Sequence, residues 1–284
     1  MNREDTSARC EKYSSKLDMF SLAYSYLCSL KGKLIQKDCM EHYFNIRYEF
    51  DHQVVHERIA QQVAEQGAGY ICVADANILQ QVHNDLSYRE VVDGAMFSIS
   101  DSSWVPVFLK RLYGIVREPY CGSMIFKDII EMKRYRQFFM GTSTKTLQAL
   151  KANLEKMDPA IADMTFYELP YLDVNDFDYP AIAEMVNRDK PDIIWVALGA
   201  PKQEIFMSKL NPYLDRGVQI AVGAAFKFYS GLEEKRAPAW MRHSRLEFLY
   251  RIYADPKKQW ARCKRIVSTL PRILKEERRR KKAC

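Results

Sequence analysis

The chain has 284 residues, of which 48% are hydrophobic and 28% are charged, and its formal net charge is +7. This composition excludes a disordered or low-complexity protein and predicts a sizeable folded core. No apolar run reaches the ~20 residues that span a bilayer, and the polar amino-terminal segment lacks the apolar stretch of a secretory signal. We therefore expect a cytoplasmic protein.

In chain order, the predicted elements begin with an amino-terminal extension, residues 1–44, in which the apolar stretch 19–30 favours an added helix. Strand-like runs follow at residues 70–74, 96–100, 137–141, 192–199 and 218–226. The segments between them repeat apolar residues every three or four positions, which is typical of helices. This alternation predicts an α/β fold with a Rossmann-like, doubly wound, mostly parallel sheet. We assign residues 45–235 to this domain and residues 236–284 to a carboxy-terminal appendage.

The appendage carries most of the charge of the protein. Residues 256–284 contain 12 Lys and Arg against two Glu, whereas the other 255 residues contain 31 basic and 34 acidic side chains. Apolar residues recur every three or four positions between these cations, at Trp260, Cys263, Val267, Leu270 and Leu274. This pattern predicts a basic amphipathic helix, with Pro271 as a kink. We favour an anionic membrane surface as its partner, with a helix docked on the body as the alternative; no nucleic-acid-binding motif is present.

Ligands of such sheets lie beyond the carboxyl ends of the strands, so the residues that follow each strand are the candidates for a site. They are Asp75 and Asn77, Asp101, Gly141, then Gly199, Lys202, Gln203 and Glu204, and finally Gly223. Glycine lets the backbone approach a ligand, and helix N-termini attract phosphate. We expect Lys202 to face a diphosphate. For Asp101 two interpretations stay open, the N-cap of the next helix or a general base beside a sugar hydroxyl.

We expect no metal and no cofactor. The seven cysteines include no C-x-x-C pair, which is typical of reduced thiols, and the five histidines lack metal-ligand spacing. Asp173, Asp176 and Asp178 form a D-x-D pattern of the kind that metal-dependent sugar transferases use, but we interpret their polar stretch as a solvated loop.

Four ordered motifs carry a resemblance to a known family. They are Ala-Leu-Gly-Ala-Pro-Lys-Gln-Glu at 197–204, Val-Gly-Ala-Ala-Phe at 222–226, Arg-Ala-Pro-Ala-Trp-Met at 236–241 and Leu-Glu-Phe-Leu-Tyr-Arg at 246–251. With them the chain resembles the WecG/TagA/CpsF glycosyltransferase family, which includes N-acetylmannosaminyltransferases, over roughly residues 45–265.

The resemblance implies a peripheral enzyme at the inner face of the cell membrane. Such an enzyme moves a sugar from a UDP-sugar to a polyprenyl-diphosphate-linked saccharide, with inversion and without a metal, in teichoic acid, capsule or exopolysaccharide assembly. Asp101 would be the base, Gln203 a site residue near the donor, and Arg251 with Lys258 or Arg262 the cations that neutralise the leaving diphosphate. A homo-oligomer is compatible with this prediction.

The sequence departs from the family pattern at four positions. Lys227 and Met124 stand where the family has Asp, Ser102 replaces a Gly, and Val73 begins a segment where the family has Thr-x-Asn. Lys227 is therefore a candidate substrate-binding residue that selects the donor sugar. A second hypothesis follows from these changes, namely a non-catalytic, membrane-docked homologue that acts as a scaffold or regulator of other glycosyltransferases.

Overall fold

The computed structural model describes residues 41–102, 104–232 and 256–283. Residues 1–41 and residues 42–284 are separate compact units, and the described residues belong almost entirely to the second. The predicted helix at 19–30 and the junction between central domain and appendage therefore lie outside the described residues.

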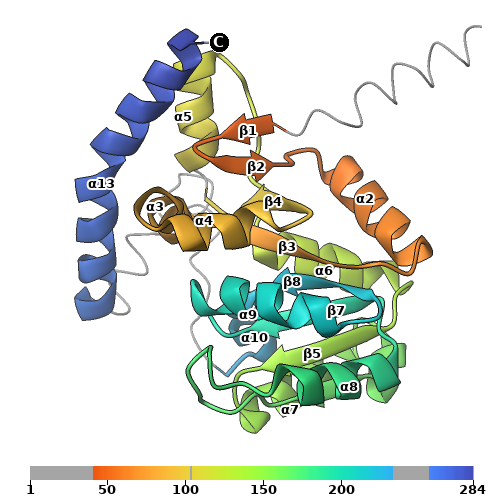
Figure 1. Ribbon diagram of the computed structural model, residues 1–284. Helices are drawn as coiled ribbons and strands as arrows, with labels where there is room; N and C mark the ends of the chain where they lie inside the picture. The colour runs from red at the N-terminus through yellow and green to blue at the C-terminus, as the bar shows by residue number, and fades with distance from the viewer. Residues whose placement is uncertain (1–40, 103, 233–255, 284) are drawn as a thin grey trace, which may run out of the picture. The chain divides into compact units, whose positions relative to one another are not determined.

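The described strands form one eight-stranded sheet in the order β1-β2-β4-β3-β8-β7-β5-β6 (Figure 1). Pairing is parallel from β2 through β6, and a two-residue turn with positive φ at Phe44 and Asn45 joins β1 to β2. The strands are β1 (Glu41–Tyr43), β2 (Ile46–Tyr48), β3 (Ala68–Ala74), β4 (Phe97–Ser100), β5 (Gln137–Gly141), β6 (Thr165–Tyr167), β7 (Ile193–Ala197) and β8 (Gly217–Ala221). The structure confirms the predicted α/β, Rossmann-like fold with a mostly parallel sheet.

Helices cover both faces of this sheet, as a doubly wound fold requires. The α-helices are α2 (His52–Ala64), α3 (Ala76–Asn84), α4 (Leu86–Asp93), α5 (Trp104–Tyr113), α6 (Gly122–Met132), α7 (Thr144–Leu154), α8 (Tyr179–Asp189), α9 (Lys202–Leu210), α10 (Gly223–Ser230) and α13 (Pro256–Ala283). The central strands are buried on both faces, which explains their continuous apolar runs.

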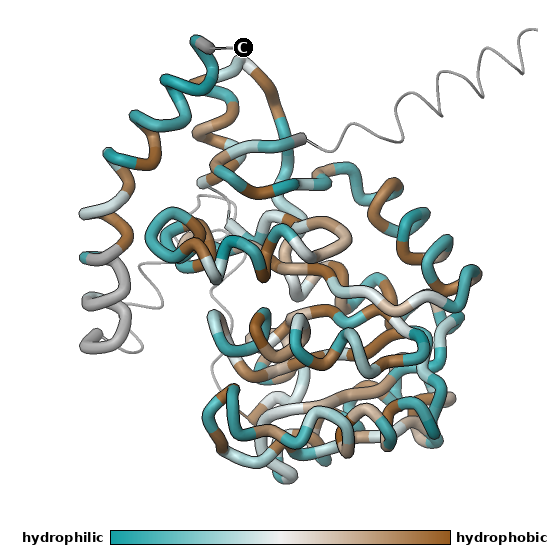
Figure 2. The backbone as a smooth tube through the Cα atoms, viewed as in Figure 1, coloured by the Kyte–Doolittle hydropathy of each residue, from teal (hydrophilic) through white to brown (hydrophobic). Residues whose placement is uncertain are grey.

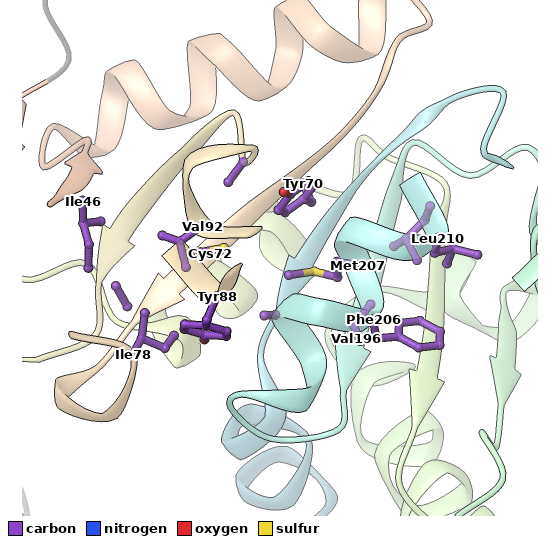
Figure 3. Close-up of a cluster of buried hydrophobic side chains, with 14 of the residues drawn as sticks. Ile46, Tyr70, Cys72, Ile78, Tyr88, Val92, Val196, Phe206, Met207 and Leu210 are labelled. Atoms are coloured by element: carbon purple, nitrogen blue, oxygen red, sulfur yellow. The ribbon is translucent and has the colours of Figure 1, made fainter. Parts of the chain in front are cut away.

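On one face, α4, α8 and α9 pack on strand residues such as Cys72 and Val196; Figure 3 shows this cluster, with Tyr88 of α4 and Phe206 of α9 in it. On the other face, the ring of Phe126 in α6 lies 4.8 Å from that of Trp195 and 5.8 Å from that of Phe226, measured between centroids. The sheet is thus held between two apolar layers.

Two details of the predicted strands are wrong. The fifth predicted strand, 218–226, ends at Ala221, and Gly223 already begins α10. An apolar run cannot by itself tell a strand from the buried first turn of a helix, and this causes the error. In addition, β1, β2 and β6, which have three residues each, were not predicted.

Gly141 ends β5 against the backbone of β7. Its φ is +111°, and a Cβ at this position would lie 2.4 Å from the carbonyl oxygen of Ala197. We expect Gly141→Ala to lower the free energy of unfolding in a urea titration by at least ~2 kcal/mol. Gly114→Ala is the matched control, because Gly114 has a φ of +74° but no atom within 4 Å of a built Cβ, and should cost only about 1 kcal/mol. Equal losses in both variants would contradict the steric explanation.

The second half of α13 docks on the body through a buried carboxylate. Glu277 is 3% exposed, like Ile273 at 2%. Its oxygens accept hydrogen bonds from Phe44 N at 3.0 Å, from the Tyr113 hydroxyl at 2.6 Å and from Arg280 Nη2 at 2.7 Å. The helix therefore joins the β1–β2 turn and the end of α5.

The apolar stripe predicted for this helix is divided between two environments. Leu274 packs on the core cluster and Leu270 is half-buried, whereas Trp260 and Val267 are both 67% exposed. Figure 2 shows the helix as mostly hydrophilic with hydrophobic bands, and it continues through Pro271. In its second half the helix thus packs Ile273, Leu274 and Glu277 on the body, as the docked alternative expects, and contact of α13 with a membrane stays a prediction. No helix among the described residues is long and apolar enough to cross a membrane.

Candidate functional site at the carboxyl edge of the sheet

The carboxyl ends of four neighbouring parallel strands bring most candidates together. The strands follow one another in the order β4, β3, β8, β7, and the residues that come after them include Asp101, Asp75, Gly223 and Gly199 respectively. Adjacent strands lie ~4.8 Å apart, so these residues share one edge of the sheet.

Asp101 is half-buried and bonded to the start of a distant helix. Its Oδ1 accepts a hydrogen bond from Gly122 N, the first residue of α6, at 2.9 Å. A Cβ at Gly122 would lie 3.2 Å from Val73 Cγ1, so this approach is tight. At the start of α5 the Ser102 hydroxyl accepts from Trp104 N. Asp101 thus caps α6, whose first residue lies 21 positions further along the chain, and its role as a base stays a prediction.

Asp75 and Asn77 form the start of α3. Asp75 Oδ1 accepts from Asn77 N at 2.8 Å and from Ile78 N at 3.0 Å. Both Asp75 and Asn77 are half-buried at the edge of the sheet. The capping bonds account for an aspartate here, and contact with a substrate stays a prediction for both residues.

Gln203 links the ends of β7 and β8. Its Oε1 accepts from Gly199 N at 3.0 Å, and its side chain is 6% exposed. A Cβ at Gly223 would lie 3.1 Å from that Oε1 and 3.3 Å from Gly199 N, so α10 begins directly against the amide. Gly199 has a φ of +79° and open space where a Cβ would be. These glycines let the chain turn and pack closely at the edge.

Glu204 is fully buried below this edge. It accepts from Gln203 Nε2 at 2.9 Å and from the Tyr88 hydroxyl at 3.2 Å. Burial raises the pKa of Glu204 to about 7. The structure therefore places Glu204 behind Gln203.

Lys202 lies against the loop that follows β6. Its ammonium group donates to the carbonyl oxygen of Leu172 and lies over the rings of Tyr171 and Phe177, at 5.5 and 5.1 Å from their centroids. The ammonium group thus contacts this loop, and the predicted contact of Lys202 with a diphosphate stays a prediction.

The helices that begin at this edge differ in how they are capped. Among the described residues, Asp75 caps α3, Ser143 caps α7, and the Glu168 carboxylate also accepts from Thr144 N at the start of α7. By contrast, α9 and α10 begin without a side-chain cap. Helix starts without a side-chain cap attract anions such as phosphate, but within these two first turns Gln203 N already donates to Gly199 O and Ala225 N to Val222 O.

The remaining candidates lie elsewhere or outside the description. Gly141 is buried against β7, where a Cβ would clash with the backbone, and this explains why the residue is a glycine. Lys227 is exposed on the second turn of α10. Arg251 lies outside the described residues, and Lys258 and Arg262 belong to α13 by their backbone alone. Their predicted contacts with the diphosphate stay predictions.

No cluster of His, Cys, Asp or Glu within the described ranges could hold a metal ion. The D-x-D stretch forms a turn and a helix cap: Asp173 accepts from Asn175 N at 3.0 Å, and Asp178 caps α8 through Ala181 N at 3.0 Å. The interpretation of this stretch as a loop is confirmed.

The residues that hold Asp101 and Glu204 could not be recognised in the sequence pattern. Gly122 holds Asp101, and Tyr88 holds the glutamate behind Gln203. Tyr88 and Val92 lie four residues apart on the apolar face of α4, so the spacing of apolar residues gave no sign that Tyr88 bonds a residue of the site.

The model of the glycosyl transferase family WecG/TagA/CpsF matches residues 43–283. The chain belongs to this family. Three similar relatives are each named N-acetylglucosaminyldiphosphoundecaprenol N-acetyl-beta-D-mannosaminyltransferase. The Bacillus subtilis (strain 168) protein is 28% identical over 200 residues, which cover 69% of this chain and 75% of that protein. The Bacillus spizizenii protein is 26% identical over 212 residues, 74% of this chain and 80% of the relative. The Staphylococcus aureus (strain NCTC 8325 / PS 47) protein is 25% identical over 217 residues, which cover 75% of this chain and 83% of that protein.

Family membership agrees with the resemblance carried by the motifs and identifies the chain as a member of a family of glycosyl transferases. Two of the four motifs, 197–204 and 222–226, lie at the carboxyl edge described above. The other two lie at 236–251, outside the described residues.

Proposed function

We propose that this protein transfers a sugar from a UDP-sugar to a polyprenyl-diphosphate-linked saccharide, at the inner face of the cell membrane and in the assembly of a cell-surface polysaccharide. The names of the relatives support the acceptor class, because they specify N-acetylglucosamine on diphosphoundecaprenol. Those names also specify a β-linked product, which requires inversion if the donor is α-linked.

The observation that carries the proposal is the placement of a carboxylate and an uncapped helix start on the same edge. Asp101 follows β4 and α10 follows β8, with β3 between them, so the two are separated by two strand spacings, roughly 10 Å. A sugar ring fits between a base at its acceptor side and a diphosphate at its donor side on this scale. In this reaction Asp101 removes the proton of the attacking hydroxyl, and N–H groups of α10 stabilise the charge that develops on UDP.

UDP binding tests this arrangement directly. UDP should raise the melting temperature of the full chain in a thermal-shift measurement, because it binds the folded state. Gly223→Ala should reduce the shift, since its methyl group would stand 3.1 Å from Gln203 Oε1 at the start of α10. No stabilisation by UDP or by any UDP-sugar would contradict the proposal and favour the scaffold hypothesis.

The membrane part of the proposal rests on two surfaces of α13. A cleft of about 540 Å³ lies between the ends of α5 and α13. Among the residues that the structure describes, its lining holds no acidic side chain and includes Arg111, Leu112, Lys275, Arg278, Arg279, Lys281 and Lys282. Nearer the start of the helix, Trp260, Lys264 and Val267 are exposed on one side, four and three residues apart. Exposed tryptophan together with clustered cations is typical of contact with an anionic bilayer surface.

The cleft lies at one end of α5 and Asp101 precedes the other end. α5 has ten residues, so its length is ~15 Å. A lipid-linked acceptor held at the membrane surface could extend from the bilayer toward the site over such a distance. This spacing supports a single orientation in which the cations face lipid while the sheet edge receives the acceptor sugar.

A further inference from the structure

Glu204 is a buried carboxylate that no cation of the described residues balances. It is 0% exposed, and no Arg, Lys or His of the described residues forms a salt bridge with it. Glutamate is rarely fully buried unless it is paired, because burial of an ionised carboxylate is strongly unfavourable. This location therefore calls for a reason beyond packing.

The carboxylate is the middle of a hydrogen-bonded chain between two helices and a strand end. The Tyr88 hydroxyl on α4 donates to Oε2 at 3.2 Å, and Gln203 Nε2 donates to Oε1 at 2.9 Å. Gln203 Oε1 in turn accepts from Gly199 N at 3.0 Å. These two contacts fix the orientation of the Gln203 amide, because a flipped amide would place its NH₂ group against the N–H group of Gly199. Gly223 closes the remaining side.

We propose that Glu204 is a positioning residue for sugar transfer: its ionised carboxylate, held by Tyr88, fixes the amide of Gln203 and the Gly199 backbone at the donor side of the site. Turnover then requires Glu204 to be ionised. This inference rests on the proposed function, and it assigns Glu204 a role through Gln203 in place of the contact with substrate expected from the motif.

The groups that face Glu204 define when it is ionised. Burial raises the pKa of Glu204 to about 7; the hydrogen bonds from Gln203 and Tyr88 oppose this shift, and the charge of Asp75 at the start of α3 adds to it. From β3 the thiol of Cys72 also faces it, and burial raises the pKa of that thiol, so it stays neutral. Burial likewise raises the pKa of Tyr88, which keeps its hydroxyl a donor.

Protonation breaks the pattern of donors and acceptors. A neutral carboxyl group has one O–H donor. On Oε1 this hydrogen would meet the NH₂ group of Gln203, which can only donate, and on Oε2 it would force the Tyr88 hydroxyl to turn and accept instead of donating. The present arrangement, in which Tyr88 and Gln203 both donate to the carboxylate, therefore requires an ionised Glu204.

The test is the pH dependence of kcat and KM for sugar transfer in the full chain. The wild type should gain about tenfold in kcat between pH 6 and pH 8, as one ionisation near pH 7 requires. Glu204→Gln should have a lower kcat that is flat over this range. Tyr88→Phe should move the inflection to higher pH, because it removes a hydrogen bond that favours the ionised form. Tyr179→Phe is the control: it removes another tyrosine hydroxyl, which donates to Val174 O at 2.5 Å, but should leave the inflection in place.

Thermal unfolding supplies a second readout that does not depend on sugar transfer. The folded-state pKa of Glu204 lies above its ordinary value of 4.5, so the stability that neutral Glu204 contributes is complete below pH 4.5 and is lost as the pH rises through 7. The melting temperature of Glu204→Gln relative to the wild type should therefore increase from pH 5 to pH 8.

The outcomes separate the two proposals. If the melting temperatures follow this trend while wild type, Glu204→Gln and Tyr88→Phe share one pH profile of kcat, Glu204 titrates without positioning Gln203, and the inference is overturned while the proposed function stands. An inflection that moves in Tyr88→Phe supports the inference even if Glu204→Gln fails to fold. Absence of sugar transfer by the wild type at every pH overturns both.

Discussion

Replacement of Asp101 by Asn should reduce turnover by two or more orders of magnitude, because the amide cannot accept the proton of the attacking hydroxyl. Folding should be preserved. Asn keeps an oxygen where Asp101 Oδ1 accepts from Gly122 N at 2.9 Å, so the start of α6 stays capped. The measurement is the initial rate of UDP release with a lipid-linked acceptor, together with the melting temperature.

Two further variants separate the cap from the base. Asp101→Ala removes the acceptor of Gly122 N as well, and we expect it to cost about 1 kcal/mol of stability in addition to the lost turnover. Asp178→Asn is the control, because Asp178 caps α8 through Ala181 N at 3.0 Å and lies outside the proposed site. Near-normal turnover in Asp101→Asn would reduce Asp101 to a helix cap.

Removal of three cations from the end of α13 should weaken binding to anionic vesicles about 100-fold, since each cation near such a surface contributes ~1 kcal/mol. The triple variant is Arg278→Gln, Arg279→Gln and Lys282→Gln, whose side chains are exposed in the cleft. Arg280 and Lys281 are left intact because they dock the helix: Arg280 donates to His42 O and Glu277, and Lys281 donates to Leu112 O.

Sedimentation with phosphatidylcholine vesicles, with and without phosphatidylglycerol, measures this effect at physiological salt. The matched control changes three exposed cations of the body, with the replacements Lys133→Gln, Lys145→Gln and Lys190→Gln. This control has the same net charge and should still bind. Equal loss in both variants would show that only net charge matters, and full binding by the α13 variant would place the membrane contact elsewhere.

The central strands could be predicted from the sequence because each of them is a continuous apolar run. Residues 137–141 and 192–199 are apolar on both faces, as buried parallel strands must be, and they became β5 and β7. The three-residue strands β1, β2 and β6 are too short to show a period. Docking of α13 depends on Glu277 and Phe44, which are 233 positions apart, and a glutamate in a basic helix gives no sign of burial.

For the candidate site, the strand ends predicted which residues lie near one another, because the topology of a parallel sheet gathers them at one edge. Asp101, Gln203 and Gly223 were found in this way. The bonds that hold them could not be found, since Asp101 pairs with Gly122 and Glu204 with Tyr88 across 21 and 116 residues. The ammonium group of Lys202 lies against a carbonyl oxygen and two aromatic rings of the loop after β6, and its contact with a diphosphate stays a prediction.

Sugar transfer itself tests the central claim most directly. The full chain is incubated with a panel of UDP-sugars and N-acetylglucosamine linked to a polyprenyl diphosphate, and both UDP and the lipid-linked product are measured. We predict that at least one donor yields a product larger by one sugar, with one UDP released per sugar added, an inverted anomeric configuration and dependence on Asp101. No acceptor-dependent release of UDP with any donor, in a chain that folds and binds vesicles, would contradict the account.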